Sequence, residues 1–233
     1  RKLLKKLKPD LVQTWMYHAD LLGGLAAYLS GIKCIVWGIH CSKLPIGRPL
    51  TKIVMLCCAR LSSWLPAKIV CVANAAKVNH IQYGYSGQKM TIVPNGFSAA
   101  HKIKSSMLFR PILAEYGIPA SAPIVGCVGR FHPDKGQDIL VRAIQQIVKT
   151  LPQVQFVFVG RGCDEQNVEF NKLIGSCGVS EQITLLGERD DIPDLLPEFD
   201  LFCMPSRSEA FPVALGEAML AGLPCIATDV GDA

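Results

Sequence analysis

The chain has 233 residues, of which 50% are hydrophobic and 18% charged, with a formal net charge of +5. This composition supports a substantial core and excludes a chain that is disordered throughout. Ten cysteines lie scattered in apolar segments, without a Cys-x-x-Cys pair or zinc spacing, so we interpret them as reduced thiols of a cytosolic protein. No apolar run reaches the roughly 18 uninterrupted residues of a membrane span.

Residues 1–8 have the pattern of an amphipathic helix, with leucines on one side and Lys/Arg on the other. That pattern leaves two interpretations open, a solvated helix face or contact with anionic lipid. We expect Asp20 to cap the next helix and Gly31 to end it. Strands are predicted at 10–14, 33–38, 68–72 and 90–93, with helices at 21–30, 50–65 and 75–83. The alternation predicts a parallel sheet covered by helices on both faces.

Pro94-Asn95-Gly96 interrupts this pattern, and the polar stretch around 94–105 predicts a hinge. Beyond it strands are predicted at 124–128, 154–159, 182–186, 200–204 and 225–228, with helices at 107–116, 136–149, 165–176, 193–197 and after Pro212. We therefore predict two α/β domains, residues 1–100 and 106–233, each cut short at its outer end. Paired domains of this kind usually bind a ligand between them, at the carboxyl ends of their strands.

The helix after Pro212 has two unusual features. Pro212 suits the first helical position, and Phe211 before it has no oxygen to cap the helix, so the first N–H groups should attract an anion. Glu217 shares a helical face with apolar residues only, namely Val213, Ala214, Leu220 and Ala221. A carboxylate buried on that face needs a hydrogen-bonding partner. Either an arginine from elsewhere in the fold or the hydroxyl groups of a ligand would supply it.

The loop after the strand at 124–128 carries Gly129, Arg130 and Lys135. Glycine lets a ligand approach the backbone, and the two cations stand at the carboxyl end of a strand. Asp134 and Gln137 are spaced as a capping box, so an anion here would be held mainly by the Arg and Lys side chains. The alternative is a pair of ordinary surface cations.

Two further features give weaker signals. Gly160 and Gly162 begin a dinucleotide fingerprint, but Glu165 stands where its third glycine should be. His18 and His40 each follow a strand of the first half, where a cleft would lie. A single loop histidine is more often an ordinary polar residue, although two facing one cleft strengthen a functional interpretation.

Taken together, these motifs resemble the two-glutamate signature of family-four (RfaG-like) retaining glycosyltransferases. Ser208-Glu209-Ala-Phe-Pro212 leads to Glu217-Ala-Met219 and Gly222-Leu-Pro224, with seven residues between the glutamates. Supporting matches, in the family's order, are Gly129-Arg130-Phe131 to Lys135-Gly136, Val93-Pro-Asn95-Gly96, the Gly160 loop and the His40 loop. Ser98 replaces the family's usual aspartate. The family's first glycine-rich loop and last elements are missing, so we expect a fragment that is inactive alone.

The resemblance implies the GT-B fold, in which two Rossmann-like domains face each other across a cleft. It implies a hexosyltransferase-type enzyme that moves a sugar from a nucleotide-sugar donor to a saccharide or lipid-linked acceptor, with retention of anomeric configuration, in polysaccharide or glycolipid biosynthesis. No metal or other cofactor and no nucleic acid is expected. The implied location is the cytoplasm, with peripheral contact at the inner face of an anionic membrane.

The resemblance also implies roles for individual residues. Arg130 and Lys135, beside Gly129, would neutralise the donor diphosphate as the sugar leaves, and Glu217 would bind the ribose hydroxyls. Glu209, with Ala210, Phe211 and Pro212, would hold the sugar and phosphate. His40 would contact the transferred sugar, and the segment from Arg189 through Ile192 would contact the base. The implied catalytic group is Glu209, His40, Arg130 and Lys135. Two alternatives remain, a nucleotide-sugar 2-epimerase on a similar scaffold and a non-catalytic binding protein in which Glu217 pairs with an arginine.

Overall fold

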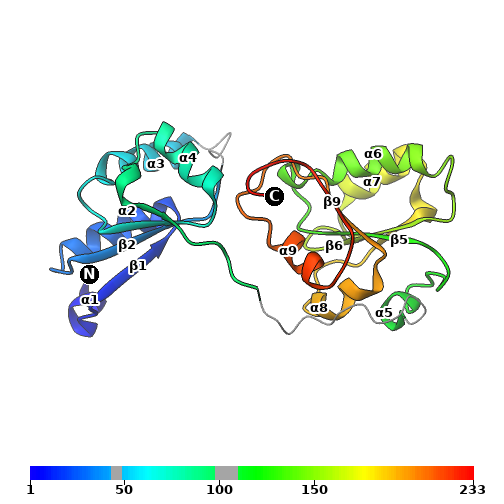
Figure 1. The fold of residues 1–233 in the computed structure, drawn as a ribbon, viewed down its shortest axis with the longest axis horizontal. Coiled ribbons are helices and arrows are strands. Elements are labelled where there is room, and N and C mark those ends of the chain that lie inside the picture. The colour runs from blue at the N-terminus through cyan, green and yellow to red at the C-terminus, as the bar shows by residue number, and fades with distance from the viewer. Residues whose placement is uncertain (43–48, 98–109) are drawn as a thin grey trace. The chain divides into compact units, whose positions relative to one another are not determined.

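The computed structural model describes residues 1–42, 49–97 and 110–233 (Figure 1). The contacts between Cα atoms divide the chain into two compact units. The first contains Arg1–Asn95, Ser208–Phe211 and Val230–Asp232. The second contains Gly96–Arg207, Pro212–Asp229 and Ala233. Of the helix predicted at 107–116, residues 107–109 lie outside the described residues, and the rest forms α5 (Pro111–Ala114).

The first unit contains a four-stranded parallel sheet in the order β1-β2-β3-β4. Its strands are β1 (Leu11–Trp15), β2 (Cys34–Ile39), β3 (Lys68–Cys71) and β4 (Met90–Ile92). Its helices are α1 (Lys2–Leu7), α2 (Tyr17–Tyr28), α3 (Pro49–Leu61) and α4 (Asn74–Gln82), with a short 3₁₀ turn at Gly87–Lys89. Helices α2, α3 and α4 each connect one strand to its parallel neighbour, as such a sheet requires.

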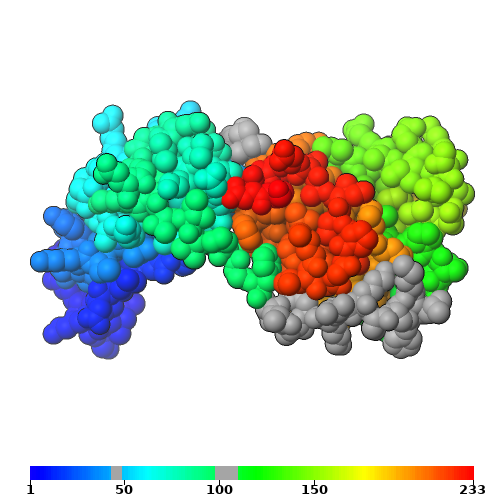
Figure 2. Space-filling view, viewed as in Figure 1, coloured from blue at the N-terminus to red at the C-terminus, as the bar shows by residue number. Residues whose placement is uncertain are grey.

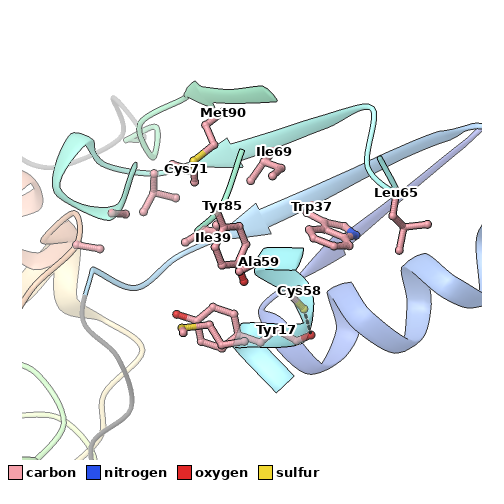
Figure 3. Close-up of a cluster of buried hydrophobic side chains, with 14 of the residues drawn as sticks. Tyr17, Trp37, Ile39, Cys58, Ala59, Leu65, Ile69, Cys71, Tyr85 and Met90 are labelled. Carbon is pink, nitrogen blue, oxygen red and sulfur yellow. Dashed lines mark hydrogen bonds between the residues drawn. The ribbon is translucent and has the colours of Figure 1, made fainter. Parts of the chain in front are cut away.

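One face of this sheet builds the core of the first unit (Figure 3). Trp37 and Ile39 of β2 and Ile69 and Cys71 of β3 are all buried, and Met55 of α3 packs with them. The side chains that alternate with these are more exposed, among them those of Leu11, Trp15 and Cys34. Within the part of the chain that the structure describes, the helices therefore cover this sheet on one face, and the prediction of two covered faces is wrong here.

The second unit contains a five-stranded parallel sheet in the order β7-β6-β5-β8-β9. Its strands are β5 (Ile124–Val128), β6 (Gln155–Val159), β7 (Ile183–Leu185), β8 (Leu201–Met204) and β9 (Cys225–Ala227). Besides α5, its helices are α6 (Gln137–Ile147), α7 (Val168–Cys177), α8 (Ile192–Leu195) and α9 (Val213–Leu220), with 3₁₀ turns at Pro133–Lys135, Ser180–Gln182 and Leu196–Glu198.

Both faces of the second sheet are covered. Phe156 and Phe158 of β6 pack in a cluster with residues of α6 and α7, whereas Val157 and Val159 pack in a cluster with residues of α8 and α9. Figure 1 shows the same division, with α6 and α7 on one side of the sheet and α8 and α9 on the other. All four β6 side chains are at most 1% exposed. A strand buried on both faces shows a continuous apolar run in its sequence instead of alternating apolar and polar residues.

The order of the second sheet indicates where a ligand would bind. The chain runs from β5 through β6 to β7 at one side, then returns to place β8 against the other side of β5. In open parallel sheets such a reversal opens a crevice at the carboxyl ends of the two strands beside it, and ligands bind there. The loops after β5 and β8 are therefore the parts of the second unit to inspect for binding.

The prediction that Asp20 caps a helix is wrong. Helix α2 begins at Tyr17, with Met16 in the cap position at φ 72°, so Asp20 falls in the first turn. Its side chain is fully buried, and its Oδ1 accepts a hydrogen bond of 2.6 Å from the Thr14 hydroxyl. The sequence signal was misleading because this aspartate bonds to the neighbouring strand instead of to the helix end.

The cysteines and the helix lengths complete the description. All ten cysteines are free thiols, and only Cys34 and Cys57 are exposed. Burial raises the pKa of several others, that of Cys163 to about 12. Among the described residues, the helices are too short or too polar to cross a lipid bilayer.

Candidate functional site

The loop after β5 is held in place by backbone and amide contacts. The Gly129 N–H donates to the Val159 carbonyl (2.8 Å), and Nε2 of Gln137 donates to the carbonyls of Gly129 (3.2 Å) and Arg130 (2.9 Å). Gly160, with φ 135°, lies so close that a Cβ there would stand 2.5 Å from the Gly129 carbonyl oxygen. The loops after β5 and β6 thus meet backbone to backbone, and no side chain fits between them.

The two cations predicted for a diphosphate lie on this loop. The aliphatic part of Lys135 runs beside Gly129, since a Cβ on that glycine would stand 3.8 Å from Lys135 Cδ. Lys135 is half-buried, and Arg130 is exposed to solvent. The structure therefore brings Gly129, Arg130 and Lys135 together at the carboxyl end of β5, beside the point where the strand order reverses.

The capping box predicted from Asp134 and Gln137 is wrong. Asp134 lies in a 3₁₀ turn, where its N–H donates to Nδ1 of His132 (3.2 Å). Gly136, with φ 67°, takes the cap position of α6, and that helix start has no side-chain cap. The side-chain amide of Gln137 instead donates to the carbonyls of Gly129 and Arg130, because the sharp turn at Gly136 brings them within reach.

Arg207, which follows β8, was missed at the sequence level. Its guanidinium donates to both oxygens of Asp138 (2.6 Å each) and to the Pro133 carbonyl (2.7 Å), and its N–H donates to the Asp134 carbonyl (2.7 Å). The hydrogen bonds to the guanidinium lower the pKa of Asp138. The segment after β8 therefore clamps the end of the β5 loop. No local pattern reveals a pair 69 residues apart.

Helix α9 differs from its prediction in two ways. Pro212 is the cap residue and not the first helical residue, although the start does lack a side-chain cap. Leu215 and Ala218 are buried, whereas the Glu217 face is mixed. On that face Ala221 is buried and Ala214 half-buried, but Val213 and Leu220 are 38% and 43% exposed. Glu217 is half-buried. The argument that it needs a ligand because it is fully buried is wrong, and any role in binding ribose must rest on its place after β8.

The segment proposed to contact the base follows β7. Arg189 donates to both carboxylate oxygens of Asp191 (2.7 and 2.5 Å) and to the Tyr116 hydroxyl (3.0 Å). The hydrogen bonds from Arg189 lower the pKa of Asp191, and the guanidinium stays partly exposed between Asp191 and Tyr116. Ile192, half-buried, begins α8. Arg189 thus orders this segment, which lies at the same sheet edge as the β5 loop.

The remaining predicted residues group with the first unit. His40 is exposed after β2, with its ring 4.5 Å from that of Trp15 in an edge-on arrangement, and partial burial lowers its pKa. His18 is exposed in the first turn of α2. In the Ser208–Phe211 segment, Ala210 is buried in the first core, and Ser42 Oγ donates to the Glu209 carbonyl. The predicted site residues are thus divided into two sets. His40 and the Glu209 segment belong to the first unit, and the β5 loop and Glu217 belong to the second.

Two family models match the chain. Residues 1–101 match the model described as "Glycosyltransferase Family 4", and residues 122–233 match the one described as "Glycosyl transferases group 1". The chain belongs to the family-four glycosyltransferases. The resemblance carried by the two-glutamate segment and its supporting loops is therefore confirmed.

Named relatives agree with this membership. The family-four chain is 30% identical over 236 residues to the UDP-Gal:alpha-D-GlcNAc-diphosphoundecaprenol alpha-1,3-galactosyltransferase of Escherichia coli. This match covers 98% of the chain and 60% of that enzyme. It is 25% identical to the 2-deoxystreptamine glucosyltransferase of Streptomyces kanamyceticus, over 99% of the chain and 62% of the relative. The chain thus spans about 60% of the length of these relatives.

Solved structures confirm the fold. The family-four chain matches Anabaena HepE in complex with UDP-glucose at a TM-score of 0.85 and 26% identity, covering 99% of the chain and 63% of HepE. Sucrose-phosphate synthase from Thermosynechococcus elongatus matches at a TM-score of 0.78 and 22% identity, over 99% of the chain and 58% of the synthase. The two parallel α/β sheets are those of the GT-B fold, as predicted.

The side chains of the described residues do not form a metal centre. Within 1–42, 49–97 and 110–233, no group of three His, Cys, Asp or Glu side chains is placed to hold an ion. The expectation that the reaction needs no metal stays a prediction.

Proposed function

We propose that the chain is part of a hexosyltransferase that moves a sugar from a nucleotide-sugar donor to a saccharide or lipid-linked acceptor. The observation that carries this is the cationic loop of Gly129, Arg130 and Lys135 at the strand-order reversal of the second sheet. A crevice there favours an anionic nucleotide. The relatives reported above are named as glycosyltransferases, and HepE was solved with UDP-glucose, which supports a UDP-sugar. An epimerase is not favoured.

In this proposal the residues act by charge and position. Arg130 and Lys135 neutralise the diphosphate as it leaves, so no metal is required. Glu217 accepts hydrogen bonds from the ribose, and Arg189 and Ile192 border the base. From the Glu209 segment, the Glu209 side chain and the backbone from Ala210 to Pro212 hold the sugar and phosphate, and His40 contacts the transferred sugar. Family membership supports retention of configuration, which the anomeric signals in the product's NMR spectrum would test.

The donor site is tested with the full-length protein. We expect UDP-sugars to raise its melting temperature more than GDP- or ADP-sugars do. Arg130→Ala and Lys135→Ala should each weaken binding about 10- to 100-fold, since each removes a charge-assisted hydrogen bond worth about 1.5–3 kcal/mol. Glu217→Ala should also reduce the shift. Thermal shift and isothermal titration, with and without EDTA, measure both effects.

A matched control is Lys149→Ala, which removes an exposed lysine of the same unit whose Nζ bonds to Gln146. It should bind donor as the wild type does. The donor-site assignment fails if no nucleotide stabilises the wild type. It also fails if the Arg130, Lys135 and Glu217 variants respond as the control does. Binding without transfer to any acceptor would instead favour the non-catalytic alternative.

The charge distribution supports peripheral contact with an anionic membrane. Residues 1–95 contain thirteen Lys/Arg and two acidic residues, whereas residues 96–233 contain eleven Lys/Arg and seventeen acidic residues. On α1, Leu4 packs against the first core, while Leu3 and Leu7 are 64% and 63% exposed among lysines. Figure 2 shows this helix, in dark blue, at the surface. We propose that α1 contacts the cytoplasmic face of the membrane that holds a lipid-linked acceptor.

Vesicle sedimentation tests this contact. The full-length protein should bind vesicles that contain phosphatidylglycerol and release them at high salt. Lys5→Glu with Lys6→Glu should weaken binding more than tenfold, because each lysine near such a surface contributes about 1 kcal/mol. Leu3→Ser with Leu7→Ser should weaken it by loss of apolar contact, and Lys149→Glu in the second unit should not. Equal binding to neutral phosphatidylcholine vesicles, or none to either kind, would contradict the proposal.

A further inference from the structure

The three residues that follow β2 are each held by a different side chain of the first unit. His40 packs edge-on against Trp15 at 4.5 Å. Sγ of Cys41 lies 3.0 Å from the Tyr17 hydroxyl, and the Ser42 carbonyl accepts a 2.8 Å hydrogen bond from Nδ2 of Asn79. Consecutive loop residues with separate tethers to β1, α2 and α4 indicate that this loop is fixed by the core below it.

Hydrogen-bond chemistry assigns a direction to the central tether. Nδ1 of His80 lies 2.6 Å from the Ala76 carbonyl, which can only accept, so Nδ1 carries the hydrogen. In a neutral ring Nε2 is then an acceptor, and the Tyr17 hydroxyl 2.8 Å away must donate to it. The tyrosine oxygen is left to accept from the Cys41 thiol. One chain of bonds therefore runs from Cys41 through Tyr17 and His80 to the backbone of α4.

The inner part of this chain of bonds is buried in the first core, whereas Cys41 at its outer end is half-buried. Tyr17 is 2% and His80 1% exposed, and the Cys58 thiol of α3 donates to the Tyr17 carbonyl (3.3 Å). Figure 3 shows Tyr17 beside Cys58 at the base of the cluster. Burial raises the pKa of Cys41 and lowers that of His80, which agrees with both being neutral. Loss of one member leaves its buried partners unsatisfied, so the bonds are costly to rearrange.

We propose that Tyr17 and His80 are positioning residues, which fix the loop from His40 to Ser42 and thereby set where His40 meets the transferred sugar. The inference rests on the proposed function for the role of His40. The fixing of the loop itself rests on the bonds alone. Because a displaced contact to the reacting sugar costs more in the transition state than in donor binding, the tethers should act on turnover.

Tyr17→Phe in the full-length enzyme tests this, with Tyr85→Phe as the matched control. Tyr85 is a buried tyrosine of the same cluster (4% exposed) whose ring packs on His80 at 5.1 Å, and its hydroxyl lies near the Cys58 thiol instead of bonding to His80 or Cys41. Tyr17→Phe should lower kcat about 10- to 100-fold with the donor KM within about twofold. Tyr85→Phe should change neither. In a His40→Ala background, Tyr17→Phe should have little further effect, because it acts through His40.

Hydrogen exchange of residues 40–42 provides a readout that does not depend on activity. It should speed up in Tyr17→Phe and not in Tyr85→Phe, and His80→Gln, which keeps a donor and an acceptor, should be less affected than His80→Phe. Unchanged exchange in Tyr17→Phe overturns the proposal, as does a fall in kcat that persists undiminished in the His40→Ala background. Faster exchange in Tyr17→Phe, together with a wild type that transfers no sugar, would instead overturn the proposed function and leave the positioning of the loop by these bonds intact.

Discussion

Gly136→Ala is expected to destabilise the second unit by several kcal/mol. Gly136 has φ 67°, a conformation that costs an alanine roughly 1–2 kcal/mol. An added Cβ would also press against the carbonyl oxygen of Pro205, a backbone atom that cannot swing aside. Overpacking of this kind adds about 1–3 kcal/mol. Urea unfolding should show a lower midpoint, and donor binding should fall because the β5 loop turns at this residue.

Gly178→Ala is the matched control for that experiment. Gly178 has the same φ of 67° at the end of α7, but an added Cβ would have nothing within 4 Å. Its alanine variant should therefore lose only the cost of the backbone conformation, roughly 1–2 kcal/mol. Equal losses at both glycines would show that the β5 loop and the segment after β8 do not touch as described.

Asp20→Asn is expected to change how stability depends on pH. Burial raises the pKa of Asp20 to about 7, against a partly opposing hydrogen bond from Thr14. Between about pH 4 and 7 the folded state then binds more protons than the unfolded state, so stability falls as the pH rises. From pH 5 to 8 this loss is on the order of 3 kcal/mol. Asparagine does not titrate, so the variant should lack this loss of stability between pH 5 and pH 8.

Urea unfolding at pH 5 and pH 8, for the wild type and the variant, isolates this effect. The neighbouring groups Tyr17, Cys41, Cys58 and His80 are present in both proteins, so their own titrations largely cancel in the difference. Asp10→Asn, which removes an exposed carboxyl, serves as the control and should retain the wild-type dependence. If Asp20→Asn and the wild type lose stability equally between the two pH values, the carboxyl does not titrate as inferred.

The order of strands and helices was predictable, since short apolar runs alternating with helices can form only a few architectures. The strand Ile124–Val128 lies as predicted because turn-forming residues bound it on both sides. Sheet order was not predictable: nothing near β8 shows that it pairs with β5 instead of β7. That pairing creates the strand-order reversal on which the proposed site depends.

Within the site, proximity along the chain decided what could be foreseen. Gly129, Arg130 and Lys135 share one short loop, so their meeting was expected. The facing of Glu217 was predicted wrongly because an eight-residue helix is too short for its period to fix which side is buried. Gln137 and Arg207 were missed or misassigned because their partners are set by tertiary turns. A polar side chain that could have capped its own helix, such as that of Asp20, bonds instead to a residue of another element.

The uneven exposure of the cysteines gives this protein a built-in site for chemical labels. The two exposed thiols, Cys34 and Cys57, both belong to the first unit, whereas each cysteine of the second unit is buried or half-buried. Burial raises the pKa of Cys127 and Cys203, so at neutral pH they carry little reactive thiolate. A maleimide dye added to the native protein should therefore mark the first unit selectively. Fluorescence measurements could then follow that unit without engineered cysteines.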